Sequence, residues 1–429
     1  MNIFLKQIQL SNYRSCVRTT INLQQSLSTL IGANGSGKSN ILNGITLLNK
    51  MLNSHQHIEE RGNSSICKVK ASFDIGGKTL NCQSVIRYIN NEKNLDSVVD
   101  VNEKWNFESF TNDSMWIKAP ISFISNLSRS SHVSSRQLML FEDDFIYSTR
   151  YAPEKASELE YLKQHYKKIA PIANEARSLM SGIVYYSASQ FTDPSKCPTF
   201  FEIDSARVTR NDIVYRRSVR SSRNEHSQFM YDLYLAYKNN TPKFQEFVSI
   251  VGKGGINLID KITYKEVKAP SRKIEVYTGG RIVKRELTNL LIIPTITVKG
   301  TRLSPNQLSE GTFKTLAIIF YLVTDESRLL LLEEPEVCVH HGLLGSIMQL
   351  VKDFSREKQI VISTHSDFVL DGLDPNNVYV IKYQPKKGTV ATHIPQAMSK
   401  QDYKALREYL NSDGNLGEYW RHGDLENDL

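Results

Sequence analysis

The chain has 429 residues, of which 40% are hydrophobic and 23% are charged, the composition of an ordinary soluble globular protein. No apolar run reaches the length that crosses a bilayer, and the N-terminus lacks the apolar core of a signal peptide, so we expect no membrane contact. The formal net charge of +8 permits contact with nucleic acid or an acidic partner but does not require it.

The five cysteines are scattered along the chain and form no close pair. This pattern indicates neither a disulfide framework nor a zinc site, and it predicts a cytoplasmic protein. The cysteines are Cys16, Cys67, Cys82, Cys197 and Cys338.

The chain opens with alternating segments at 3–10 and 18–23, which predict two antiparallel strands, and a third strand is expected at 26–31. The next segment, Gly32–Ser39, fits the phosphate-binding pattern of glycine, four residues, glycine, lysine and serine. Residues 40–52 have helical apolar spacing. Backbone N–H groups of such a loop bind phosphate, Lys38 reaches the β- and γ-phosphates, and Ser39 places its hydroxyl on magnesium. The alternative is a chance glycine-rich turn.

The middle of the chain predicts a mixture of strands and helices. Strands are expected at 68–73, 84–89, 97–107 and 183–186, and a long loop or a mobile lid at 112–144. A helix is expected at 156–180, bent or broken at Pro171, and two helices at 226–251, split near 239–242. Further strands are expected at 256–267, 273–277, 282–287 and 290–298.

A second phosphate-binding candidate is Leu308–Thr312, which precedes a helical run at 313–323. Its Leu-Ser-x-Gly form places a serine hydroxyl and glycine amides at a helix N-terminus, where they can grip a γ-phosphate. The alternative is an ordinary N-capped helix.

Two strand ends carry candidate catalytic groups. The apolar run 329–332 ends in Glu333 and Glu334, and strand alternation predicts opposite directions for the two carboxylates. Glu333 would orient magnesium, and Glu334 would polarise the attacking water. The strand at 360–362 leads to His365, which can hydrogen-bond the γ-phosphate. The alternatives are solvated acids and a structural histidine.

Together these motifs resemble the ABC-type ATPases of the RecF, SMC and OLD group. The loop Gly32–Asn40 matches the Gly-x-Asn-Gly-x-Gly-Lys-Ser-Asn form of that group, and 10–15 resembles its early Asn-Phe-Arg motif. The resemblance is specific over about 1–60 and 285–385. It implies an α/β fold, an ABC-type P-loop ATPase head with a mixed β and helical insertion. The nucleotide-binding residues that it implies are Asn34, Gly35, Gly37, Lys38, Ser39, Asn40, Arg14, Gln190, Ser309 and Gly311.

The resemblance also implies ATP and Mg²⁺ as cofactors, with Ser39 and Glu333 at the metal and Glu334 and His365 in catalysis. It implies a head-to-tail dimer or higher oligomer, in which the signature of one subunit completes the ATP site of another. The Glu333–Glu336 sequence favours OLD-type ATPases. The residues after His365 are too few for the nuclease domain of OLD nucleases. We therefore expect the effector, such as a nuclease, to be a separate protein in antiviral defence.

Two other functions remain open from the sequence. One is a RecF-like DNA repair or maintenance ATPase, and the other is the ATP subunit of a membrane transporter. Nucleic-acid contact is predicted through a basic cluster, which has a solvated or partner-binding face as its equal alternative. Its residues are Arg210, Arg216, Arg217, Arg220 and Arg223.

The predicted organisation has four parts. Residues 1–60 form the N-terminal lobe of the head with the phosphate loop, and 61–284 form the insertion and a helical region. Residues 285–399 form the C-terminal lobe with the signature and the catalytic strand ends, and 400–429 form a C-terminal tail.

Overall fold

The computed structural model describes residues 3–53, 66–89, 98–107, 117–118, 171–204, 225–278, 281–412 and 414–421. The chain divides into two compact units. Unit 1 comprises Met1–Tyr185, Glu326–Glu334 and Ser355–Leu429, and unit 2 comprises Tyr186–Asp325 and Pro335–Phe354. The boundaries of these two units differ from those of the four parts predicted from the sequence, and the division into four parts stays a prediction.

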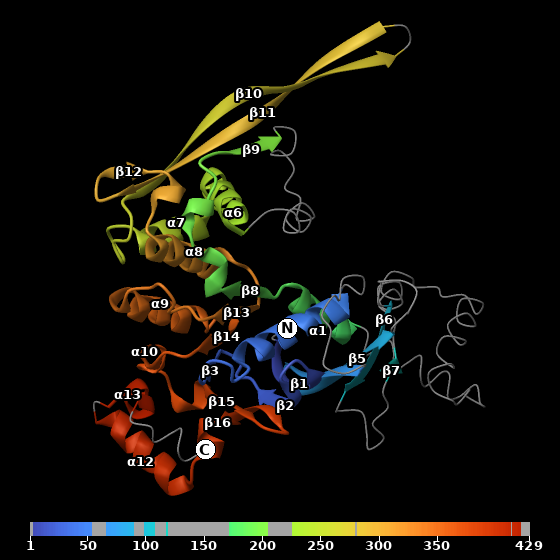
Figure 1. The fold of residues 1–429 in the computed structure, drawn as a ribbon, viewed down its shortest axis with the longest axis vertical. Coiled ribbons are helices and arrows are strands. Elements are labelled where there is room, and N and C mark those ends of the chain that lie inside the picture. The colour runs from blue at the N-terminus through green and yellow to red at the C-terminus, as the bar shows by residue number, and fades with distance from the viewer. Residues whose placement is uncertain are drawn as a thin grey trace, which may run out of the picture. The chain divides into compact units, whose positions relative to one another are not determined.

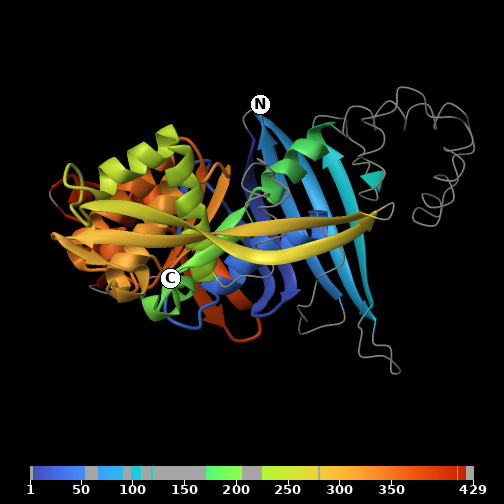
Figure 2. The ribbon, with the colours of Figure 1, turned by 90° about the horizontal axis from the view of Figure 1, so that it is seen from above.

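Unit 1 contains a six-stranded antiparallel sheet, visible as the blue and cyan strands of Figure 2. Its order is β2-β1-β4-β5-β6-β7. The buried residues of β1 alternate along most of the strand, so one face packs into the core while the other is polar. The strands are β1 (Ile3–Tyr13), β2 (Cys16–Asn22), β4 (Ile66–Ile75), β5 (Lys78–Ile89), β6 (Val98–Phe107) and β7 (Ile117–Lys118).

A second six-stranded sheet has the order β16-β15-β3-β14-β13-β8 (Figure 1). Its central strands are parallel and buried along almost their whole length, which explains their continuous apolar sequences. The strands are β3 (Leu27–Ile31), β8 (Val184–Ser187), β13 (Leu329–Glu333), β14 (Gln359–Thr364), β15 (Val378–Gln384) and β16 (Gly388–His393).

Helix α1 (Lys38–Asn53) contacts strands of both sheets. Its buried face includes Ile41, Leu42, Ile45 and Leu48, at helical spacing, and these side chains join the main hydrophobic core. The described part of a further helix, 171–181, contributes Ala173 and Ala176 to the same core. The core therefore holds α1 in place, and α1 begins at Lys38, at the end of the phosphate loop.

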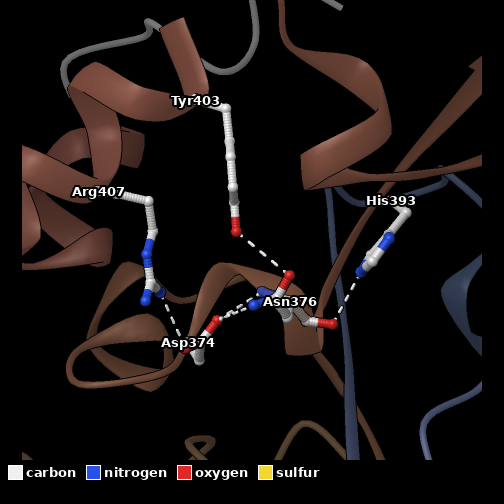
Figure 3. A network of polar contacts seen from close by, with 5 residues as sticks. All are labelled: Asp374, Asn376, His393, Tyr403 and Arg407. Atoms are coloured by element: carbon white, nitrogen blue, oxygen red, sulfur yellow. Dashed lines mark hydrogen bonds and ion pairs between the residues drawn. The ribbon is translucent and has the colours of Figure 1, made fainter. Parts of the chain in front are cut away.

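The C-terminal part of unit 1 holds α10 (Asp367–Leu370), η5 (Pro375–Asn377), α11 (Ile394–Ala397), α12 (Lys400–Asn411) and α13 (Leu416–Arg421). Figure 3 shows the polar contacts that attach α12 to η5. Arg407 Nη1 donates to Asp374 Oδ2 at 2.9 Å, and the Tyr403 hydroxyl donates to Asn376 Oδ1 at 3.2 Å. A ring nitrogen of His393 lies 2.7 Å from the Asn376 carbonyl oxygen.

Unit 2 is built around α8 (Glu310–Thr324), whose side chains are buried from Phe313 to Val323. The other helices are α6 (Glu225–Asn239), α7 (Pro242–Val251), α9 (His341–Phe354), η2 (Ala188–Phe191), η3 (Pro194–Lys196) and η4 (Pro305–Gln307). A four-stranded antiparallel sheet comprises β9 (Phe201–Asp204), β10 (Lys261–Thr278), β11 (Arg281–Val298) and β12 (Thr301–Leu303). Strands β10 and β11 form a long hairpin (Figure 1).

Most predicted elements are present, with several differences. The four strands expected at 256–298 are two continuous strands, and the interruption near Pro270 is a register shift between Pro270 and Arg272. The tail after α12 contains the additional helix α13. The predicted loop at 112–144 lies outside the described residues except for β7. Within the described part of the chain, no helix is both long and apolar enough to span a bilayer.

Candidate nucleotide site

Three of the sequence motifs meet at one edge of the second sheet of unit 1. Strands β3, β14 and β13 are parallel neighbours, and their carboxyl ends align. Ile31 pairs with Thr364, and Ser363 pairs with Glu333. The phosphate loop follows β3, Glu334 follows β13, and His365 follows β14. This edge therefore brings a predicted phosphate grip and two predicted catalytic groups together from positions far apart in sequence.

The phosphate loop has the backbone shape that its glycines predict. Gly35 and Gly37 have φ angles of 81° and 103°, in the region that favours glycine. The Lys38 ammonium is buried and donates to the carbonyl oxygens of Gly32 and Ala33, at 2.8 and 3.1 Å. The lysine is thus held inside the curve of the loop. Ser39 and Asn40 follow on the first turn of α1, both half-buried.

A chain of hydrogen bonds fixes the loop from the opposite end of the sequence. Asn40 Nδ2 donates to Ser15 Oγ at 2.6 Å, and Ser15 Oγ lies 2.7 Å from Thr389 Oγ1. Thr389 Oγ1 donates in turn to the Ser36 carbonyl oxygen at 3.1 Å. A Cβ at Gly37 would lie 2.0 Å from Thr389 Oγ1, so the loop and β16 approach too closely for any side chain there. The fully buried Thr389 is thus a member of the site that sequence reasoning missed.

Arg14 joins the same network from the turn after β1. Its Nη1 donates to Asn40 Oδ1 at 3.4 Å, and its guanidinium carbon lies 5.3 Å from the centre of the Tyr13 ring. The backbone of Arg14 has φ 48°, an uncommon angle for a residue with a side chain. The predicted nucleotide-binding arginine is therefore positioned beside the start of α1, where the phosphate loop ends.

The two acidic residues of the predicted catalytic pair differ in backbone and partners. Glu333 is the last residue of β13, whereas Glu334 has φ 48° and has left the strand. Strand alternation therefore does not set the direction of the Glu334 carboxylate, because a left-handed residue makes the turn, and the predicted separation of the two carboxylates stays a prediction. Glu334 Oε1 lies 3.4 Å from His365 Nδ1, and the Glu334 N–H donates to the Ser363 carbonyl at 2.8 Å.

Glu333 has a partner that sequence reasoning did not identify. The hydroxyl of Tyr185, on β8, donates to Glu333 Oε2. Burial, together with this hydrogen bond, raises the pKa of Tyr185 well above its ordinary range, so the phenol stays protonated and remains a donor. The bond fixes one oxygen of Glu333 and leaves the second available as a ligand.

The signature residues lie in unit 2, at the N-terminus of α8. Ser309 is the N-cap, and its Oγ accepts from the Thr312 N–H at 3.2 Å. A Cβ at Gly311 would lie 2.6 Å from the Cys338 carbonyl oxygen. The ammonium of the fully buried Lys314 donates to the Val337 carbonyl, and Cys338 Sγ lies 3.2 Å from Glu310 Oε1. These contacts attach the signature helix to the loop 335–340 within one subunit.

Gln190 also lies in unit 2, on η2. Its Oε1 accepts from the Ser187 N–H at 3.0 Å. The amide oxygen of Gln190 therefore stabilises the turn between β8 and η2. The predicted basic cluster, from Arg210 to Arg223, lies outside the described residues.

A family comparison agrees with this arrangement. The sequence model described as the AAA ATPase domain matches residues 3–370. The chain belongs to this family. As an AAA ATPase domain it is a nucleotide-binding protein, and the predicted α/β P-loop ATPase head is confirmed.

Solved structures similar to this AAA ATPase domain include three SMC head domains. One is an SMC head bound to the C-winged helix domain of ScpA, with 12% identity, a TM-score of 0.46 and coverage of 94% of this chain and 99% of that chain. An SMC head from Thermotoga maritima has 12% identity, a TM-score of 0.42 and coverage of 91% of this chain and 98% of that chain. An SMC head from Pyrococcus furiosus, bound to the C-terminal domain of ScpA, has 13% identity, a TM-score of 0.45 and coverage of 95% of this chain and 100% of that chain. No curated protein matches the sequence.

The residues of this AAA ATPase domain suit a nucleotide–magnesium complex. The Ser39 hydroxyl and the Glu333 carboxylate are hard oxygen donors, which Mg²⁺ prefers. Both lie at the sheet edge where the phosphate loop and β13 end. When bound, the ion would neutralise charge on the β- and γ-phosphates. The roles of the individual site residues remain predictions.

Proposed function

We propose that the chain binds ATP with Mg²⁺ and hydrolyses it at the edge formed by β3, β14 and β13. The observation that carries this proposal is the pairing register, which aligns Ile31 with Thr364 and Glu333 with Ser363 and so gathers the phosphate loop, His365 and Glu334. Lys38 binds the β- and γ-phosphates, and Ser39 and Glu333 hold the ion. Glu334 orients and polarises the attacking water, and His365 positions Glu334 and donates to the γ-phosphate.

We further propose that two copies pair head to tail, so that Ser309 of one copy completes the phosphate site of the other. The exposed position of Ser309 at the N-terminus of α8 supports this pairing. ATP would hold the dimer closed, and hydrolysis would open it. The resemblance of Glu333–Glu336 to OLD-type ATPases supports control of a separate effector, such as a nuclease, in antiviral defence.

The test is nucleotide binding and phosphate release by the purified chain with and without Mg²⁺. We expect hydrolysis that requires the ion and that Lys38→Ala removes by weakening ATP binding. Lys352→Ala, on α9 in unit 2, is the matched control and should leave both unchanged. Tight ATP binding by Lys38→Ala would place the nucleotide elsewhere, and the assignment of this edge would then be abandoned.

A further inference from the structure

One segment of unit 2 carries a large excess of positive charge. Residues 261–302, which form β10, β11 and β12, contain ten lysines and arginines and three acidic residues. The formal net charge of this segment is therefore +7, compared with +8 for the whole chain. Such a concentration can attract a polyanion over several ångströms, especially at low salt.

The pairing register sorts these residues between the two faces of the hairpin. Residues that are opposite each other in an antiparallel pair share a face, and successive residues alternate. Lys261 pairs with Thr297, and Lys265 pairs with Ile293. The register shift after Pro270 moves β10 by one residue, so the pairs Arg272–Leu287, Ile274–Arg285 and Thr278–Arg281 fall on that same face. We call it the basic face, with the residues Lys261, Lys265, Arg272, Arg281 and Arg285.

The two faces differ in charge balance. In the described backbone of β10 and β11, the register places no acidic residue on the basic face. All three glutamates of the hairpin fall on the opposite face, where Lys273 pairs with Glu286 and Lys284 pairs with Glu275. The basic residues of this balanced face are Lys268, Lys273 and Lys284, and its acidic residues are Glu266, Glu275 and Glu286.

The balanced face already has a partner within unit 2. The Tyr234 hydroxyl of α6 donates to Glu266 Oε1 at 2.8 Å, and Lys238 Nζ lies 3.3 Å from the same oxygen. These contacts hold the pKa of Glu266 below its ordinary value. On the basic face, the side chains of Lys261 and Lys265 are exposed, and Lys268 of the balanced face is exposed as well. In this half of the hairpin the two faces therefore differ in charge balance and in the contacts of Glu266 with α6, and not in exposure.

The outer half of the hairpin is a two-stranded ribbon. In the described residues, strand β9 pairs with β11 as far as Asn289, and it places Glu202 and Asp204 on the basic face beside Leu291 and Asn289. Beyond Asn289, β10 and β11 pair with each other and with no other described strand (Figures 1 and 2). The three arginines of the basic face all lie in this two-stranded part, where β10 and β11 themselves place no acidic residue on that face.

We propose that this two-stranded part of the hairpin binds double-stranded nucleic acid through the basic face. A two-stranded ribbon fits the major groove of B-DNA, which is about 12 Å wide. The stretch from Arg272 to Thr278 is roughly 20 Å long at about 3.3 Å per residue, enough to cross the groove and reach phosphates on both sides. Arginine also suits phosphate by its planar fork of donors. A narrow ribbon with charge on one face fits a groove between two phosphate rows better than a flat acidic protein surface.

The test uses two triple variants of the full chain that remove equal charge from opposite faces. One is Arg272→Gln with Arg281→Gln and Arg285→Gln, and the matched control is Lys268→Gln with Lys273→Gln and Lys284→Gln. Binding to a fluorescent 30-base-pair duplex of mixed sequence is measured by anisotropy over a series of salt concentrations. Each lost phosphate contact should reduce the magnitude of the slope of log K against log salt by about 0.9. The slope of the arginine variant should therefore be smaller than that of the wild type by roughly 2.7, and its affinity should be lower by about tenfold or more. The slope of the lysine control should change by less than about 1.

Folding is checked by the melting temperature and by nucleotide binding, which both variants should retain. If the triple arginine variant misfolds, Arg285→Gln alone should flatten the slope by about 0.9. Equal losses in the two triple variants would overturn the proposal, because bulk charge and not one face would then be responsible. Absence of duplex binding by the wild type at low salt, or equal competition by polyglutamate, would also overturn it in favour of an acidic protein partner. The proposal does not depend on ATP hydrolysis.

Discussion

The Nδ1 atom of His365 lies 3.4 Å from the Oε1 atom of Glu334, across the ends of two neighbouring parallel strands. The His365 ring and the Glu334 carboxylate, which come from different motifs, therefore lie side by side beyond the sheet edge. The left-handed backbone of Glu334 makes this possible, because it turns the carboxylate out of the line of β13. A base that polarises water requires this kind of orientation by a third group.

Glu334→Gln should stop ATP hydrolysis while leaving ATP binding intact. The amide keeps the size of the side chain but cannot take up charge as the water is activated, and loss of such a transition-state group costs about 3 kcal/mol or more, a factor of 10² to 10³ in kcat. Phosphate release and nucleotide affinity measured on the same sample separate the two steps. Glu336→Gln is the neighbouring control and should keep more activity. Hydrolysis at the wild-type rate by Glu334→Gln would show that another group activates the water.

Thr389→Val should weaken ATP binding, whereas Thr389→Ser should not. Valine has almost the same shape but lacks the hydroxyl, so the buried Ser36 carbonyl loses the donor that holds the phosphate loop. An unsatisfied buried group costs about 1–3 kcal/mol, which corresponds to about tenfold in affinity if the cost falls on the nucleotide-binding shape of the loop. Equilibrium binding of a fluorescent ATP analogue measures this, with the melting temperature as the folding check. Equal affinities for the valine and serine variants would show that the hydroxyl does not position the loop.

Thr389 and Tyr185 illustrate what the sequence could not predict. The phosphate loop, α1 and the buried strands follow from local spacing, since glycine positions and apolar runs act over a few residues. Thr389 meets Ser15 across 374 positions, and Tyr185 meets Glu333 across 148. A single threonine or tyrosine carries no local signal of such a contact. These partners became visible only when the sheet order placed β16 and β8 beside the motifs.

Asp374 should contribute stability that depends on pH. Its burial raises the pKa, but hydrogen bonds from the Asn376 N–H and Arg407 outweigh burial and hold the pKa below the ordinary value of 3.8. A lowered pKa in the folded state means that the stabilisation is present above the unfolded pKa and is lost as pH falls through the folded value. The side chains of Asp374 and Arg407 are both 44% exposed, so solvent screening limits the effect.

Asp374→Asn should therefore lower the free energy of unfolding at pH 7 by about 1 kcal/mol or less, and the difference from wild type should shrink below about pH 3. Chemical denaturation at both pH values measures it. Glu408→Gln, which removes a more exposed acid from α12, is the control and should change stability less at either pH. A deficit of Asp374→Asn that is the same at pH 7 and at pH 3 would mean that the charge on Asp374 is not its source.

The signature needs a test that separates the interface from folding. Gly311 is unsuitable, because an arginine there would collide with the Cys338 carbonyl of the same subunit, and loss of activity would follow from that alone. Ser309 is exposed and acts as the N-cap of α8. Aspartate and asparagine are both good N-cap residues, so either can replace the serine with little change in helix stability. The two differ in one negative charge at the position predicted to meet a γ-phosphate.

Ser309→Asp should abolish ATP-driven association and hydrolysis, whereas Ser309→Asn should keep much of both. The expected loss comes from repulsion between the carboxylate and the phosphate of the partner's nucleotide. ATP binding by the single subunit should not change, since the proposed contact is made in trans. Light scattering with and without ATP measures association. A mixture of Ser309→Asp and Lys38→Ala subunits forms one site with both lesions and one intact site, so it should regain hydrolysis that neither variant shows alone. Loss of ATP binding by isolated Ser309→Asp subunits would instead show that the signature acts within its own chain.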